Sequence, residues 1–112
     1  IEDILTALAR IEQYTAGLDE QTFAADNKTF DAVVRNLEIV GESARFIPEA
    51  VITQWPTVPW ARMRGLRNYV VHQYFAIDRS EIWSTVVQDL PPLVSQLRTI
   101  LQSDDVSGEW PP

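Results

Sequence analysis

The amino-acid sequence predicts an all-α domain, folded as an antiparallel up-and-down bundle of four to five helices. Apolar residues recur at intervals of three and four, and no segment alternates apolar and polar residues long enough for a half-buried strand. The stretches that join the periodic segments are short, which favours antiparallel neighbours. At 112 residues, 46% of them apolar, the chain suffices for one core. We expect residues 1–102 to form this domain and residues 103–112 to form a flexible C-terminal tail.

Two long helices are expected in the first half of the chain. The first begins at Ile1, carries an apolar residue at every third or fourth position, and stops at about Gly17. The second spans about residues 26–46 and is closed by Pro48. Gly41 lies inside this second helix, where glycine costs about 1 kcal/mol relative to alanine. We therefore predict that another helix crosses closely at Gly41.

The segment “PEAVITQWPTVPW” that follows is predicted to be a connector, with one short helical turn and then a loop bracketed by prolines. Its P-x-x-P pattern also occurs in ligands of proline-binding domains, but a loop that joins two helices explains the prolines better. A third helix is expected from about Pro59, because proline is tolerated in a first turn, to about Tyr74.

The last helix is predicted to begin at Asp78, which forms a capping-box pattern with Glu81, and to run to Leu101. Pro91 and Pro92 interrupt this stretch. Both lack an amide hydrogen and restrict the residue before them, so the helix is expected to kink or split there.

Charge is unevenly distributed along the chain. The net charge of −7 argues against a protein that coats nucleic acid nonspecifically, because such binding depends on Lys and Arg. Residues 62–79, however, hold four arginines against one aspartate, a net +3, while the remainder holds five basic and 15 acidic residues, a net −10. This basic window on an acidic protein predicts a local anion site.

The composition also bears on the cellular compartment. The chain contains no cysteine, so it has neither disulfides nor thiolate ligands, and nothing in it requires an oxidising environment. No run approaches the roughly 18 apolar residues needed to cross a bilayer. We therefore expect a cytoplasmic protein without membrane contact.

The basic window contains the stretch “RGLRNYVVHQYF”, residues 64–75, with His72 as the sole histidine of the protein. On a helical wheel one side of this stretch is apolar, while Arg64, Asn68 and His72 form a polar stripe on the other side. Arg67 lies about 140° around the helix from His72 and about 7.5 Å away along the axis. A straight helix does not aim Arg67 and His72 at one point. Either the helix distorts near its C-terminus, or the long arginine sweeps round, or a second subunit completes the pair.

Two plainer interpretations compete with an active site. A lone histidine near a helix C-terminus is often a favourable charge on the helix dipole. Glu38 and Glu42 fit a solvated or salt-bridged face better than a metal site, because one histidine and no cysteine leave few ligands. Motifs of the common hydrolases, phosphate-binding loops and zinc sites are absent from the sequence. We predict neither a metal nor a cofactor.

The segments “AVVRNLEIVGESAR” and “PWARMRGLRNYVVHQYFAIDRSEIWSTVVQDLPPL” closely resemble the HepT family of HEPN-domain proteins, the toxins of bacterial and archaeal toxin–antitoxin operons. The similarity covers about residues 1–101. The signature of that family is R-x-x-x-x-H-x-Y, which here falls on Arg67, His72 and Tyr74. The signature also lies in a matching order of helices.

The resemblance implies a dimeric, metal-independent endoribonuclease, with Arg67 and His72 as catalytic residues in a cleft along the dimer interface. It also implies a partner, the minimal nucleotidyltransferase MntA, which transfers AMP to the motif tyrosine, here Tyr74, and thereby silences the toxin. A composite site agrees with the offset between Arg67 and His72. Asn68 and Arg64 are expected to support the site, Asn68 by orienting the imidazole or a phosphate oxygen.

The chemistry of these residue types is consistent with RNA cleavage. The 2′-OH of RNA attacks the adjacent phosphate without water or metal if a base, an acid and a cation assist. Histidine takes or gives a proton near neutral pH, and arginine offers a permanent planar cation. One chain supplies one imidazole, whereas a two-fold dimer supplies both a base and an acid.

Some alternatives stay open at this point. The helical wheel places Tyr74 beside the apolar face, so a buried structural tyrosine is the plain alternative, and modification requires the helix to fray before Asp78. The chain as a whole could instead be a non-catalytic HEPN module that binds nucleotide or RNA, or a purely structural dimerisation domain. Turnover of RNA, and its dependence on His72, distinguish these possibilities.

Overall fold

The computed structural model describes residues 1–103. Within them the chain forms helices and no strand, in the order α1 (Glu2–Thr15), α2 (Glu20–Ala25), α3 (Asn27–Ala44), α4 (Glu49–Gln54), α5 (Trp60–Gln73), α6 (Arg79–Ser84) and α7 (Leu90–Gln102). A 3₁₀ turn, Tyr74–Ala76, follows α5, and a π-helical turn, Thr85–Asp89, joins α6 to α7. The predicted all-α class is confirmed. The predicted tail, apart from Ser103, lies outside the described residues.

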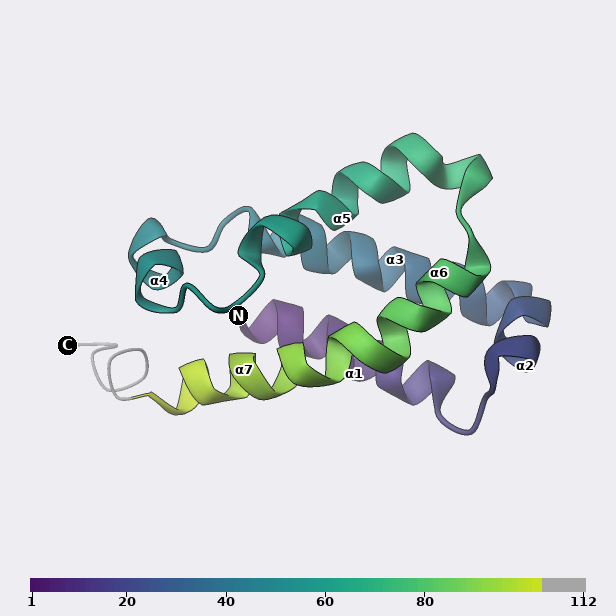
Figure 1. Ribbon diagram of the computed structural model, residues 1–112, viewed down its shortest axis with the longest axis horizontal. Coiled ribbons are helices and arrows are strands. Elements are labelled where there is room, and N and C mark those ends of the chain that lie inside the picture. Colours follow the sequence, from purple (N-terminus) through teal and green to yellow (C-terminus); the bar gives the residue numbers. More distant parts are fainter. Residues whose placement is uncertain (104–112) are drawn as a thin grey trace.

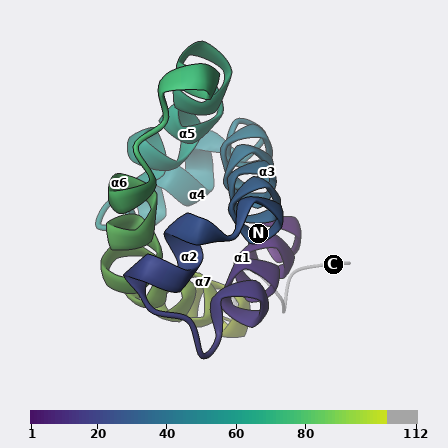
Figure 2. The same ribbon diagram turned by 90° about the vertical axis from the view of Figure 1, so that its right-hand side faces the viewer.

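Four long rods make up the bundle in residues 1–103: α1, α3, α5 and the rod that continues from α6 to α7 (Figure 1). Consecutive rods run in opposite directions, as the sequence predicted, and the short helices α2 and α4 lie at opposite ends. Helix α3 packs against both α1 and α5, and α1 also contacts α7. Seen from the end of the bundle, α5 forms its outer edge (Figure 2).

The core lies mainly between α1, α3 and α7. Side chains from these helices, together with Phe23 of α2, are almost completely buried, among them Ile4, Leu8, Ile11, Val33, Leu37, Val40, Leu97 and Ile100. Burying each such side chain contributes about 1.5–3 kcal/mol. In the described part of the chain, no helix combines the length and apolarity that a membrane span needs.

The first helix ends close to the predicted position, where Gly17 adopts a φ of 79° and turns the chain. Helix α2, in contrast, is not among the predicted helices. Asp19 caps it through a box with Thr22, in which each side chain accepts a hydrogen bond from the other's amide, at 2.8 and 2.9 Å. Because threonine replaces the usual Glu or Gln and only Phe23 is buried, α2 lacks the sequence signals of a helix. Asp26 then caps α3, so α3 begins near the predicted start.

Helices α3 and α5 cross at Gly41, as the glycine predicted. A Cβ at this site would lie 2.5 Å from the backbone nitrogen of Arg67 and 3.0 Å from the carbonyl oxygen of Met63. Both atoms belong to the backbone of α5, which cannot move aside as a flexible side chain can. Glycine is therefore required for this approach, and the crossing fixes the position of Arg67 along α3.

The connector between α3 and α5 has the predicted form, a short helix followed by a proline-bracketed loop. Helix α4 provides the short helical turn, and Pro59 occupies the N-cap of α5. Trp60, the first residue of α5, anchors the loop: its indole Nε1 donates a hydrogen bond to the carbonyl oxygen of Trp55 at 2.9 Å. Val58, within the loop, is buried. These contacts hold the start of α5 firmly.

The last rod begins at Asp78, whose carboxylate accepts hydrogen bonds from the amides of Ser80 and Glu81 at 2.9 and 3.4 Å. The two prolines that open α7 remove the amides that would bond the carbonyls one turn earlier. The backbone responds with the π turn, in which the amide of Leu90 donates to the carbonyl of Thr85, five residues back. The predicted distortion is thus confirmed, and the rod continues through it without a break in the helix.

Candidate active site

Helix α5 and the turn after it carry the predicted site residues, with Arg67 beside the contact with α3 and His72 exposed in the last helical turn. The buried side chains of α5 are Trp60, Met63 and Val70, which pack toward the core, and its principal neighbour is α3. Since α5 lies at the edge of the bundle, its remaining sides reach solvent (Figure 2). The exposed or half-buried residues include the whole predicted site: Arg64, Arg67, Asn68, His72 and Tyr74.

Arg67 is held by its neighbours but remains accessible. Its Nε lies 3.6 Å from a carboxylate oxygen of Glu42 on α3, and its Nη1 donates to the Oδ1 of Asn68 at 3.4 Å. Glu42 also accepts hydrogen bonds from Arg45 at 3.2 Å. One carboxylate is therefore shared by two guanidinium groups. Such half-exposed ion pairs contribute at most about 1 kcal/mol, so a phosphate can displace them.

A hollow of about 430 Å³ opens beside these groups, lined by Arg45, Ala61, Arg64, Gly65, Arg67 and Asn68. We call it the cationic hollow. Two of its arginines, Arg64 and Arg67, belong to α5, and the third, Arg45, is the C-cap residue of α3. Three guanidinium groups against the single carboxylate of Glu42 leave a net positive charge. The cationic hollow lies where the basic window predicted a local anion site, and it includes one arginine, Arg45, from outside that window.

His72 lies in the last turn of α5 with its side chain exposed. Within the described residues it makes neither a hydrogen bond nor an ion pair, which leaves both ring nitrogens open to a ligand. A cation at this position interacts favourably with the C-terminal end of the helix dipole. The exposed position agrees with either a reactive group or a simple surface charge.

Arg67 and His72 are not brought together in one copy of the chain. Helix α5 stays α-helical as far as Gln73, so the predicted offset of about 140° and about 7.5 Å between the two residues holds. No contact joins them among the described residues. Asn68, for its part, bonds Arg67 rather than His72. Of the three routes to convergence, distortion of the helix before His72 is therefore absent here.

Tyr74 is exposed at 58%, because α5 ends just before it and the 3₁₀ turn carries the ring away from the apolar face. A buried structural tyrosine is therefore wrong, and the fraying that access requires is present. Tyr69, one turn earlier, behaves differently. Burial raises the pKa of its hydroxyl, and the nearby carboxylates of Glu81 and Asp78 add to the effect.

A model of the family described as “Ribonuclease HepT-like” matches residues 4–100. The chain belongs to the HepT-like ribonuclease family. Among its relatives is a Thermococcus cleftensis protein named “Probable ribonuclease HepT”, 39% identical over 93 residues, which are 83% of this chain and 84% of the relative. A Methanocaldococcus jannaschii protein named “Putative RNase MJ0127” is 36% identical over 107 residues, covering 96% and 87% of the two chains. No solved structure matches this HepT-like chain.

The predicted salt-bridged face on α3 of this HepT-like protein is confirmed. Glu38 pairs with Arg35 at 3.1 Å, and Glu42 pairs with Arg45 at 3.2 Å and with Arg67 at 3.6 Å. In the part of the chain that the structure describes, no three His, Cys, Asp or Glu side chains gather as a group that could hold a metal ion.

Arg45 is the site residue that the sequence analysis missed in this family member. Nothing in helical periodicity connects the end of one helix with the middle of another. The available signal was Gly41: a helix that crosses there lies one turn before Arg45, which brings the arginine to the crossing helix.

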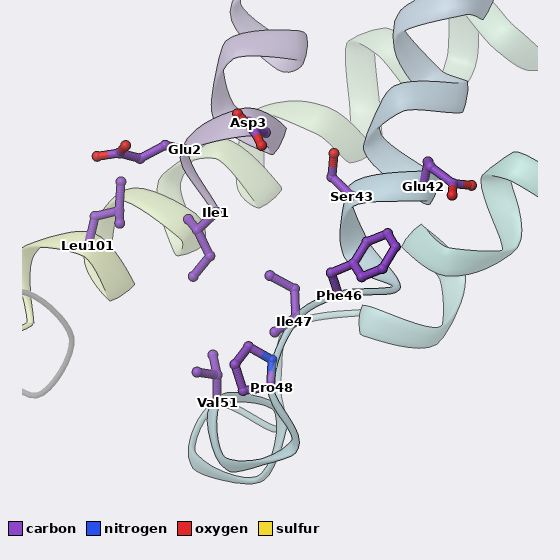
Figure 3. A pocket seen from close by; sticks show the side chains of 10 residues that line it. All are labelled: Ile1, Glu2, Asp3, Glu42, Ser43, Phe46, Ile47, Pro48, Val51 and Leu101. Carbon is purple, nitrogen blue, oxygen red and sulfur yellow. The ribbon is translucent and has the colours of Figure 1, made fainter.

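A larger hollow of the HepT-like domain lies away from the signature residues. Its volume is about 760 Å³, and it is lined by residues at the start of α1, the ends of α3 and α7, and the start of the connector (Figure 3). Apart from Ser43 its side chains are apolar or acidic, among them Phe46 and Ile47 with Glu2 and Asp3. A hollow with this lining repels phosphate, so size alone does not locate the site.

Proposed function

We propose that this chain is the toxin of a type VII toxin–antitoxin system, a metal-independent endoribonuclease that a nucleotidyltransferase silences by modifying Tyr74. The observation that carries the proposal is the accessibility of Arg67 and His72 on α5 and of Tyr74 on the turn that follows it, in a chain of a ribonuclease family. The cationic hollow beside Arg67 suits a chain of phosphates, because arginine binds phosphate oxygens in a planar fork. An RNA substrate and a chain without cysteine fit a cytoplasmic enzyme.

The proposed reaction uses the 2′-OH of the RNA as the nucleophile. His72 takes the proton of this hydroxyl, the 2′-oxygen forms a bond to the adjacent phosphorus, and the bond between phosphorus and the 5′-oxygen breaks. A second imidazole donates a proton to that leaving oxygen. The products are a 2′,3′-cyclic phosphate and a 5′-OH. Arg67 stabilises the negative charge that grows on the phosphate oxygens.

A homodimer supplies what one copy lacks. Each chain holds one histidine, and its Arg67 and His72 are offset along α5. A two-fold axis near the outer side of α5 would place the Arg67 of one copy near the His72 of the other, with two imidazoles in one cleft. The unpartnered outer side of α5 supports this arrangement (Figure 2). Asn68 and Arg64 then position Arg67 and the neighbouring phosphate.

Silencing by an MntA-like antitoxin fits the position of Tyr74. Its hydroxyl lies on an exposed 3₁₀ turn two residues after His72, where a partner enzyme can reach it. Each transferred AMP adds a negative charge and a bulky base, which compete with RNA for the arginines. After incubation with a cognate nucleotidyltransferase and ATP, mass spectrometry should find AMP on Tyr74 in the wild type. Tyr74→Phe should stay active and unmodified, and AMP on Tyr14 or Tyr69 alone would contradict the assignment.

The reaction is tested by incubating the full chain with single-stranded RNA in excess chelator. We expect cleavage to persist and the products to carry 2′,3′-cyclic phosphate and 5′-OH ends. His72→Ala serves as the matched protein control, because the side chain is exposed and makes neither a hydrogen bond nor an ion pair within residues 1–103. Products with 5′-phosphate ends, or cleavage that stops in chelator, would refute the mechanism.

A non-catalytic HEPN module that binds nucleotide or RNA is the alternative function. The observation that favours it is the separation of Arg67 from His72, together with the engagement of Arg67 by Glu42. Such a module would bind RNA through the cationic hollow but release no product. Turnover in excess of protein therefore separates the two functions.

A further inference from the structure

The 3₁₀ turn after α5 displays an unusual aromatic residue. Phe75 is 99% exposed, and its neighbour Tyr74 is 58% exposed. The two rings meet edge to face, with centroids 5.0 Å apart and an interplanar angle of 83°, so each ring fixes the other. Val71, one turn earlier on α5, is also exposed. We call Val71, Tyr74 and Phe75 the aromatic ledge.

The exposure of Phe75 demands an explanation beyond the fold. A phenylalanine left in water forgoes about 1.5–3 kcal/mol that burial would provide. A buried position lay within reach, because a hollow of about 650 Å³ opens beside the ledge and is floored by Phe30, Val70 and Ile77. The ring of Phe75 stands at the rim of this hollow and does not fill it. Because Val71 and Tyr74 are exposed beside it, Phe75 belongs to a contiguous apolar patch, and such patches mark interaction sites.

The surroundings of the ledge indicate what it binds. Along the chain it lies next to basic residues: Arg67 lies one helical turn before Val71, and His72 lies between Val71 and Phe75. On the side of the 650 Å³ hollow, Asp31 and Glu38 balance Arg35 and Arg79, so this side adds no net charge. The excess positive charge thus lies on the side of the cationic hollow. A ligand with phosphates at one end and a flat ring at the other would match this arrangement.

We propose that the aromatic ledge is a base-stacking subsite, in which a nucleobase next to the cleaved phosphate of single-stranded RNA stacks on Phe75. This inference rests on the proposed function. Stacking of bases on exposed aromatic rings, combined with a cationic groove along the backbone, is how proteins hold single strands. A duplex keeps its bases stacked inside and offers no free face to Phe75. The ledge thereby selects unpaired RNA.

A second copy of this chain is a poorer occupant of the ledge. A stable subunit contact buries about 800 Å² on each partner, whereas an aromatic side chain contributes about 150–250 Å². The ledge holds two aromatic rings and one valine. It can lie at the mouth of a dimer cleft, but it does not provide a dimer interface by itself.

Binding is tested with the full chain carrying His72→Ala, so that the RNA stays intact. The probe is a fluorescein-labelled single-stranded 12-mer RNA of mixed sequence, followed by fluorescence anisotropy. Adding Phe75→Ala should weaken binding about 5- to 150-fold, as loss of one stacked base does. Phe75→Trp should restore affinity to within about twofold, whereas Phe75→Leu, which is apolar without an aromatic face, should resemble Phe75→Ala.

Two controls separate stacking from other effects. Phe46→Ala removes another exposed phenylalanine, at the end of α3 near the start of α5, and should leave RNA affinity unchanged. An RNA whose central nucleotides are abasic should bind the His72→Ala protein equally well with and without the Phe75→Ala substitution. Phe75→Ala should also leave the salt dependence of binding unchanged, because it removes no phosphate contact.

The outcomes separate this inference from the function on which it rests. If the parent His72→Ala protein binds no RNA, the proposed function itself fails. If it binds and Phe75→Ala binds within about twofold of it, the base-stacking subsite is refuted while the proposed function stands. If Phe75→Ala changes the oligomeric mass measured by light scattering, the ledge is a subunit contact and the inference is overturned.

Discussion

Helix α3 buries eight residues whereas α5 buries three, although the two helices lie against each other over the same crossing. Helix α3 is enclosed by neighbours and contributes side chains to the core between α1 and α7. Helix α5 packs on α3 through one side, where Met63 and Arg67 lie against Gly41, and we call this contact the seam. The other sides of α5, at the edge of the bundle, are largely exposed (Figure 2). Stability and the proposed activity are therefore divided between the helices: packing on α3 positions α5, and the exposed surface of α5 carries polar and aromatic residues that the core would not tolerate.

Substitutions of the accessible site residues of α5 should have the strongest effect on function while leaving the packing of α5 on α3 in place. His72→Ala and Arg67→Ala should each lower RNA cleavage by about 100-fold or more, because a general acid–base group contributes about 10²–10⁴-fold and a donor that stabilises developing charge about 10²–10³-fold. Unfolding free energy should change by less than about 1 kcal/mol for both, since neither side chain is buried. Cleavage assays and urea denaturation measure the two effects. A variant that keeps full activity would remove that residue from the site.

The second substitution is in the seam itself. Gly41→Ala places a Cβ 2.5 Å from the backbone of α5 and should cost about 1–3 kcal/mol of unfolding free energy, as overpacking does. Gly65→Ala is the matched control, because a Cβ there meets nothing within 4 Å and replaces a glycine inside a helix. It should gain about 0.5–1 kcal/mol. Equal effects of both substitutions in urea denaturation would mean that the crossing is not tight.

A weaker effect is expected at Arg45, which caps α3 and lines the cationic hollow. In the His72→Ala protein, Arg45→Gln should weaken RNA binding several-fold and reduce the slope of log affinity against log salt by about 1. Arg10→Gln, which removes an exposed arginine of α1, should change the affinity little and the slope not at all. Anisotropy titrations at several salt concentrations provide the measurement. An unchanged slope for Arg45→Gln would exclude Arg45 from the phosphate path.

The weakest effect concerns Asp26, the N-cap of α3, which lies far along the helix from the contact with α5 at Gly41. Hydrogen bonds from the Thr29 side chain and amide lower the pKa of Asp26 below its ordinary value of 3.8. The ionised cap therefore stabilises the fold above about pH 4, and this stabilisation is lost as the pH falls through the lowered pKa. Thermal melts at pH 7 should show Asp26→Ala below the wild type, with the gap closing at acid pH. A gap that is independent of pH would mean that the charge is immaterial.

Local sequence signals predicted most of the fold. The periodic helices α1, α3 and α5, the crossing at Gly41 and the distortion at the two prolines follow from patterns within a few residues. Helix α2 did not, because its capping box uses Thr22 and its short length shows no period. The helical wheel also failed at Tyr74, since it assumes a helix that in fact ends at Gln73.

The candidate site was only partly predictable for a related reason. The positions of Arg67 and His72 on α5 follow from helix geometry alone, and so does the gap between them. Arg45 joins the site through a tertiary contact between two helices, which periodicity does not encode. The exposure of Phe75 depends on where the 3₁₀ turn points, which no local pattern fixes.

The carboxylate of Glu42, shared by Arg45 and Arg67, has a consequence for selectivity. It is a tethered competitor, present at an effective concentration of about millimolar or more at the arginines that it occupies. A small free anion must displace the Glu42 carboxylate from these arginines and forms no further contacts that would compensate. A strand of linked phosphates that also touches Arg64 and His72 gains avidity from each further contact. At the proposed RNA site, Glu42 would therefore disfavour short anions more than polymers.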